Sequence, residues 1–181
     1  MTLLYTDQIP TPIGEVFIAL EGHQLVFLDF ADNLERIEKL LRRRYGTYAL
    51  EPTHNPHGLS KRVSSYFDGD PTALEGIEVS TGGTAFQKQV WNGLLEIPRG
   101  QTWSYGQLAA HLKNPGAVRA VGQTNGLNPV ALVLPCHRVV GANGTLTGYA
   151  GGLERKKWLL EFEHGSIGSR VDSSARGVPL F

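Results

Sequence analysis

The sequence has little of several features that would by themselves indicate a class of protein. It contains a single cysteine, which excludes an intrachain disulfide and a zinc site built from several cysteines. No apolar run approaches the length needed to cross a bilayer, and no basic and apolar signal segment opens the chain. We therefore expect a cytoplasmic protein that does not bind membranes.

The formal net charge is zero, yet the charges are unevenly distributed along the chain. Residues 1–83 hold 7 Lys and Arg against 12 Asp and Glu, whereas residues 84–181 hold 10 against 5. A basic segment suits a polyanionic partner, because Lys and Arg displace counterions from phosphates. A chance distribution of a few charges explains the asymmetry equally well.

The first part of the chain predicts an α+β domain over residues 1–83. Two apolar segments, 15–20 and 25–30, flank a turn at 21–24 and indicate a β-hairpin. His54 and His57 form an H-x-x-H pattern in a predicted loop without a nearby cysteine, so we expect no metal site. Two helices are predicted from apolar residues at helical spacing: Leu34, Ile37, Leu40, Leu41 and Tyr45, then Leu59, Val63, Tyr66 and Phe67.

A second domain is predicted over residues 84–165. Thr84 and Gln87 form a capping box that opens a helix, which we expect to end at Ile97 because Pro98 follows. The last clear helix runs from about Leu153 to His164. Residues 166–181 are rich in serine and glycine and predict a flexible tail.

Two short helices in the second domain form the outline of a helix-turn-helix. Ser104 and Gln107 repeat the capping box at the start of the first helix. The second helix, roughly residues 116–125, is expected to face Val118 and Val121 inward. Arg119 and Gln123 share its opposite face, and the small residues around Arg119 would let the helix approach a groove closely.

The single cysteine, Cys136, is a candidate nucleophile, although a buried and inert thiol is the plainer alternative. A thiol needs a base or a positive environment to ionise. His137 is adjacent, but in an extended segment the two side chains point apart, so the imidazole would act through a water molecule. Glu163, unfavourably placed at the end of the last helix, is the candidate group to orient His137, with a solvated carboxylate as the alternative.

Five motifs in order and spacing make the chain resemble a known family over about Thr84 to Glu163. They are Ser104-Tyr105-Gly106-Gln107-Leu108-Ala109, Arg119-Ala120-Val121-Gly122, Asn128-Pro129, Pro135-Cys136-His137-Arg138-Val139 and Gly148-Tyr149-Ala150-Gly151-Gly152. The family is that of the methylated-DNA–protein-cysteine methyltransferases, also called O6-alkylguanine-DNA alkyltransferases. The resemblance implies a ribonuclease H-like N-terminal domain, with a small antiparallel sheet and helices, and a mostly helical, winged-helix-like C-terminal domain.

The resemblance also implies roles for individual residues. Cys136 would take an alkyl group from O6 of guanine or O4 of thymine and keep it, without a cofactor or metal. His137 and Glu163 would activate Cys136, and Tyr105 would stabilise the leaving base. Asn128 would brace the turn before Cys136. Val139, Tyr149, Ala150 and Gly151 would line the alkylguanine pocket, with Ala150 standing where some members have serine.

As a partner, the resemblance implies double-stranded DNA bound in its minor groove by the second helix of the helix-turn-helix. Arg119 would fill the gap left by a flipped-out nucleotide, beside Ala120, Gln123 and Tyr105. The protein would act as a monomer, with cooperative binding along DNA left open. Two alternatives remain: a non-catalytic module that binds alkylated bases, and a cysteine hydrolase using Cys136 and His137.

Overall fold

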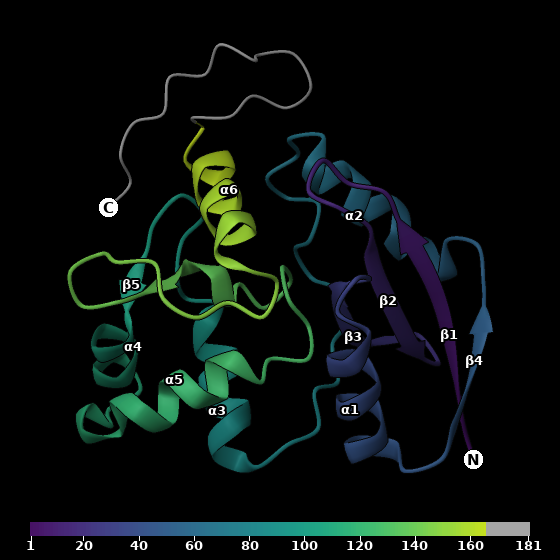
Figure 1. Ribbon diagram of the computed structural model, residues 1–181, viewed down its shortest axis with the longest axis horizontal. Coiled ribbons are helices and arrows are strands. Elements are labelled where there is room, and N and C mark those ends of the chain that lie inside the picture. The colour runs from purple at the N-terminus through teal and green to yellow at the C-terminus, as the bar shows by residue number, and fades with distance from the viewer. Residues whose placement is uncertain (166–181) are drawn as a thin grey trace. The chain divides into compact units, whose positions relative to one another are not determined.

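The computed structural model describes residues 1–165, which divide into two compact units (Figure 1). The first comprises Met1–Gly82 with Pro129–Val133, and the second comprises Gly83–Asn128 and the chain from Leu134 onward. The α+β fold class is confirmed. The tail predicted for residues 166–181 lies outside the described residues. In residues 1–165, no helix has the length and apolar character needed to span a membrane.

The first unit is built on a four-stranded sheet with the order β3-β2-β1-β4. The predicted hairpin is confirmed as β2 (Val16–Glu21) and β3 (Gln24–Phe30). β1 (Thr2–Ile9) pairs antiparallel with β2, whereas β4 (Tyr48–Pro52) pairs parallel with β1. The expectation of an antiparallel sheet therefore holds for two pairings and needs correction at the β4 edge.

Both predicted helices of this unit are present. α1 (Leu34–Tyr45) packs Ile37 and Leu41 against the sheet, where they bury apolar side chains of β1, β2 and β3. α2 (Leu59–Phe67) follows the short 3₁₀ turn η1 (Pro56–Gly58) and buries Leu59, Val63, Tyr66 and Phe67, the four residues predicted from periodicity.

The second unit is mostly helical and contains both predicted capping boxes. α3 (Ala85–Leu94) begins after Thr84, and α4 (Tyr105–His111) begins after Ser104. α3 ends three residues before the predicted Ile97, because residues 95–97 continue in a tighter turn whose amides bond to the third residue back. The remaining elements are α5 (Val118–Gly126), α6 (Leu153–His164), the short strands β5 (Trp103–Ser104) and β6 (Val139–Val140), and the 3₁₀ turns η2 (Pro115–Ala117) and η3 (Cys136–Arg138).

The apolar segment before Cys136 belongs in part to the first unit. The Leu28 amide donates to the Pro129 carbonyl at 2.9 Å, and the Ala131 amide donates to the Leu28 carbonyl at 3.0 Å. All residues of Pro129–Val133 are buried. The chain that links α5 to the candidate nucleophile is therefore held in place as a further strand-like segment beside β3.

Candidate active site

Cys136 opens the turn η3 and is 8% exposed. Its amide donates to the Leu134 carbonyl at 2.7 Å, and the Arg138 amide donates to the Pro135 carbonyl at 3.0 Å. The expectation of an extended segment at this point is therefore wrong. In a 3₁₀ turn successive side chains are rotated by about 120° rather than pointing to opposite faces, so the arrangement of Cys136 and His137 is set by a turn.

His137 and Glu163 are brought together as predicted, from η3 and from the last turn of α6. His137 Nε2 lies 2.8 Å from Glu163 Oε1, and both side chains are buried. An ionised carboxylate only accepts hydrogen bonds, so Nε2 carries the proton in the neutral imidazole and Nδ1 is left as the basic atom. Nδ1 is buried and has no hydrogen-bond partner within residues 1–165. His137 therefore holds an unused proton acceptor next to Cys136.

Arg138 is a second partner of Glu163, a role that was not predicted from the sequence. Its Nε and Nη2 donate to the two carboxylate oxygens of Glu163 at 2.8 Å each, and its Nη1 donates to the Ile97 carbonyl at 2.8 Å. Burial alone would raise the pKa of Glu163, but the electrostatic interactions with His137 and Arg138 and the hydrogen bonds from both residues outweigh it and hold the pKa well below its ordinary value. Glu163 is thus an ionised hydrogen-bond acceptor at neutral pH.

Two buried asparagines hold the turn that carries Cys136. Asn128 Nδ2 donates to the Leu134 carbonyl at 2.7 Å, which is the contact expected of a brace. Asn125, on α5, donates through Nδ2 to the carbonyl of Cys136 itself at 3.3 Å. Asn125 was not predicted from the sequence, although its position two residues after Gln123 places it on the buried side of α5. The DNA-binding helix expected from the sequence is therefore tied directly to the backbone of the candidate nucleophile.

Tyr105, at the first position of α4, is half-buried between α5 and the loop that precedes α6. Its hydroxyl donates to the Thr147 carbonyl at 3.3 Å. Gly122 faces the Tyr105 ring, where an added Cβ would lie 3.6 Å from the ring. Tyr105 thus links the expected DNA-binding helix to the expected pocket loop.

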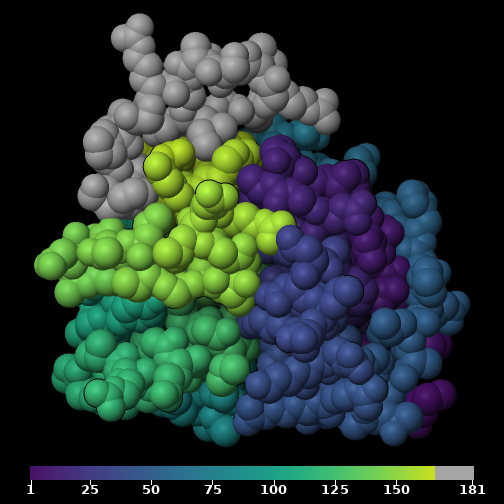
Figure 2. All heavy atoms as spheres, in the orientation of Figure 1, coloured from purple at the N-terminus to yellow at the C-terminus, as the bar shows by residue number. Residues whose placement is uncertain are grey.

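The residues expected to line a pocket lie on β6 and in the loop that follows it. Val139 is fully buried, and its carbonyl accepts a hydrogen bond from Lys156 Nζ at 2.6 Å. The loop of residues 141–152 lies at the surface of its unit (Figure 2). In this loop Tyr149 and Gly151 are partly buried, whereas Ala150 is exposed.

The exposed side of α5 carries the residues expected to contact DNA: Arg119, Ala120 and Gln123 are all exposed. Val121 is buried as predicted, but Val118 is 40% exposed, so its expected inward orientation is wrong. Val118 is the first residue of α5 and directly follows η2, so it lies at the end of the helix, before the first buried residue of the helix, Val121.

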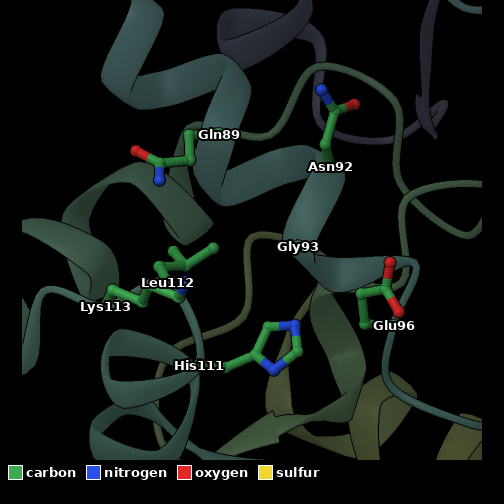
Figure 3. A pocket seen from close by; sticks show the side chains of 7 residues that line it. All are labelled: Gln89, Asn92, Gly93, Glu96, His111, Leu112 and Lys113. Carbon is green, nitrogen blue, oxygen red and sulfur yellow. The ribbon is translucent and has the colours of Figure 1, made fainter.

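A separate hollow of about 300 Å³ lies in the same unit between α3 and the end of α4 (Figure 3). Polar side chains, among them Glu96, His111 and Lys113, line it, and it contains none of the predicted site residues. Within residues 1–165, no cluster of three or more His, Cys, Asp or Glu side chains could hold a metal ion.

Known proteins resemble this chain in both sequence and fold. Residues 85–165 match the family described as 6-O-methylguanine DNA methyltransferase, DNA binding domain. The methylated-DNA–protein-cysteine methyltransferase of Salmonella typhimurium is 46% identical over 166 residues, which cover 90% of this chain and 97% of that protein. Its counterpart from Mycobacterium tuberculosis is 42% identical over 167 residues, covering 89% and 93%.

A solved structure agrees with these relatives. The crystal structure of Mycobacterium tuberculosis OGT in complex with DNA superposes with a TM-score of 0.77 at 38% sequence identity, covering 91% of this chain and 96% of that one. Identity at this level over nearly the whole length of the relatives, together with a shared fold, shows that the chain belongs to the methylated-DNA–protein-cysteine methyltransferase family.

Proposed function

We propose that this protein repairs DNA by moving an alkyl group from O6 of guanine, or O4 of thymine, to the sulfur of Cys136. The observation that carries the proposal is the arrangement around the only thiol of the chain. His137, next to Cys136, has an ionised carboxylate on Nε2 and a buried Nδ1 without a hydrogen-bond partner among the described residues. This imidazole is arranged to take a proton from a neighbouring group.

The proposed reaction is a displacement in which the thiolate attacks the alkyl carbon. The sulfur–carbon bond forms as the carbon–oxygen bond breaks, and the electron pair of the broken bond remains on the base. The thiol proton passes through a water molecule to Nδ1 of His137, and one proton is returned to the leaving base. The net change exchanges the thiol hydrogen for the alkyl group. Because no step of this reaction cleaves the new sulfur–carbon bond, the thiol is not regenerated and each molecule reacts once.

Tyr105 is proposed to stabilise the leaving base through its hydroxyl as negative charge develops there. Its present acceptor, the Thr147 carbonyl at 3.3 Å, is a long contact that a base could replace. The pocket around the base is proposed to consist of the Val139 backbone, Tyr149, Ala150 and Gly151. A backbone amide of Ala150 would serve there as well as that of a serine.

DNA is the proposed partner, bound through the exposed face of α5 in the minor groove. Arg119 would occupy the space of a flipped-out nucleotide. The small side chain of Ala120 and the polar side chain of Gln123 would lie against the DNA backbone. Contacts to phosphates give little sequence preference. A monomeric state, a cytoplasmic location and independence of cofactors remain predictions.

A turnover experiment tests this proposal. The protein is mixed with a molar excess of duplex DNA that carries O6-methylguanine, and repaired guanine is counted per molecule of protein. We expect repair to stop at one guanine per protein. A Cys136→Ser variant should repair no guanine. Continued turnover would indicate a hydrolase, and binding without any repair would indicate a module that only recognises alkylated bases.

A further inference from the structure

Thr147, in the loop between β6 and α6, contacts the hydroxyl of Tyr105 through both of its polar groups. Its carbonyl accepts a hydrogen bond from that hydroxyl at 3.3 Å, and its own Oγ1 donates to the Tyr105 oxygen at 3.4 Å. A phenol has one proton to donate and an oxygen that also accepts. Thr147 therefore provides Tyr105 with both an acceptor and a donor, and the proposed mechanism assigns no role to the Thr147 side chain.

The backbone of the loop brings Thr147 to this position. The Gly141 amide donates to the Thr145 carbonyl at 2.8 Å, and the Gly144 amide donates to the Gly141 carbonyl at 2.9 Å, which closes a turn. After this turn Thr147 passes beside Gly141, where an added Cβ would lie 3.6 Å from Thr147 Cγ2. Because a β-branched side chain is stiff at χ1, the position of this methyl group also sets the direction of Oγ1 towards Tyr105.

The two contacts respond differently to a base that accepts a hydrogen bond from Tyr105. The single proton of the Tyr105 hydroxyl points to one acceptor, so the base would replace the Thr147 carbonyl. That carbonyl keeps a hydrogen bond from Lys156 Nζ at 2.9 Å and is not left unsatisfied. The hydrogen bond from Thr147 Oγ1 does not use the Tyr105 proton, so it can remain while the base is bound.

We propose that Thr147 is a positioning residue for alkyl transfer, whose hydroxyl supports Tyr105 while Tyr105 donates to the leaving base. The inference rests on the proposed transfer to Cys136. As negative charge develops on the base, it polarises the Tyr105 hydroxyl, and a donor on the Tyr105 oxygen strengthens the hydrogen bond to the base. The Tyr105 proton changes its acceptor without leaving its oxygen. Both contacts are long for hydroxyl groups, and such contacts often shorten when a substrate binds.

The test is single-turnover methyl transfer from duplex DNA containing O6-methylguanine to Cys136, measured over a range of DNA concentrations. Thr147→Val keeps the side-chain shape and the backbone carbonyl and removes only the hydroxyl. We expect its limiting rate to fall about fivefold, as for the loss of one hydrogen bond, while the half-saturating DNA concentration stays within about twofold. Thr147→Ser keeps the hydroxyl, and its limiting rate should stay within about twofold of the wild type.

Tyr105→Phe shows whether the effect acts through Tyr105. This variant lacks the group that Thr147 supports, so adding Thr147→Val to it should cause no further loss of rate. A general disturbance of the loop would slow transfer equally with and without the Tyr105 hydroxyl. Such equal losses, or an unchanged limiting rate in Thr147→Val alone, would overturn the inference.

Thr145→Val is the matched control, because Thr145 is an exposed threonine of the same loop and bonds to Gly141 through its carbonyl. Its limiting rate should equal that of the wild type. Iodoacetamide alkylates Cys136 without a leaving base, so its rate should be the same in Thr147→Val and the wild type. A slower alkylation in Thr147→Val would place the effect on the thiol and reject the inference.

The same kinetics separate the inference from the proposed function. A wild type that transfers no methyl group to Cys136 would reject the proposed function and the inference together. A wild type that transfers the methyl group at the same limiting rate as Thr147→Val would reject the inference alone.

Discussion

His137 Nε2 and Glu163 Oε1 are 2.8 Å apart, and both side chains are almost completely buried. The carboxylate is further held by two hydrogen bonds from Arg138. This relationship fixes which imidazole nitrogen carries the proton and leaves Nδ1 as the base. The orientation of His137 therefore depends on a residue 26 positions later in the chain.

Replacing Glu163 with Gln should damage both stability and alkyl transfer. The variant leaves the Arg138 guanidinium and the His137 imidazole without their buried counter-charge, and breaking such a pair costs about 3 kcal/mol. Loss of the correct imidazole tautomer should slow methyl transfer by about 100-fold. Urea unfolding and single-turnover kinetics measure the two effects.

Glu161→Gln is the control for this variant. Glu161 lies two residues earlier on α6, and its carboxylate is 3.9 Å from Lys157 Nζ in a surface pair. Such pairs contribute about 0.5 kcal/mol or less, and no effect on transfer is expected. If Glu163→Gln behaves like Glu161→Gln, Glu163 does not orient His137.

The depressed pKa of Glu163 predicts a specific acid sensitivity. The pKa in the folded state lies below the ordinary value of 4.5. The stability that Glu163 contributes is therefore fully present above about pH 4.5 and is lost as the pH falls towards the folded-state pKa. Wild-type protein should lose free energy of unfolding on acidification below that pH more steeply than Glu163→Gln, as followed by urea unfolding at several pH values. Parallel pH curves for the two proteins would contradict the assignment.

The two capping boxes offer a matched test of how Tyr105 is positioned. Ser104→Ala and Thr84→Ala each remove the hydroxyl that accepts the amide of the third helical residue, and each should cost about 1 kcal/mol of stability. Only Ser104 precedes Tyr105 directly, so only Ser104→Ala should also slow methyl transfer. Equal transfer rates in the two variants, measured at matched folded fractions, would show that the α4 cap does not set the position of Tyr105.

Arg119→Ala should separate nucleotide flipping from chemistry. Flipping costs a few kcal/mol, so losing the residue that fills the gap should slow reaction with O6-methylguanine in duplex DNA by about 100-fold. Reaction with free O6-methylguanine should stay within about twofold, since no stack must be opened. Lys88→Ala removes an exposed cation from α3 and serves as the control. Equal losses on both substrates would refute the flipping role.

The helices of this protein could be predicted from the sequence because local signals define them. Thr84 and Ser104 mark their own helices through capping boxes, and α6 ends at His164 as predicted, with Gly165 in the left-handed conformation after it. β1 and β4 were not predicted. β1 carries polar residues such as Asp7 and Gln8, and β4 is a short, largely exposed edge strand, so neither has a clear apolar alternation.

The site could be predicted in part. Glu163 was predicted because an acidic residue at the C-terminal end of a helix is expected to have a cationic partner. The family resemblance supplied the remaining roles. Arg138 and Asn125 were not predicted because their contacts depend on the turn η3, and the sequence predicted an extended segment there. Thr147 was not predicted because no local pattern reveals that its hydroxyl and carbonyl meet a tyrosine 42 positions earlier in the chain.

The most direct measurement is the intact mass of the protein after incubation with duplex DNA containing O6-methylguanine, followed by peptide mapping. The predicted result is a gain of one methyl group per protein, located on Cys136, and no gain with unmodified duplex. No gain in mass, or a methyl group on any other residue, would contradict the account.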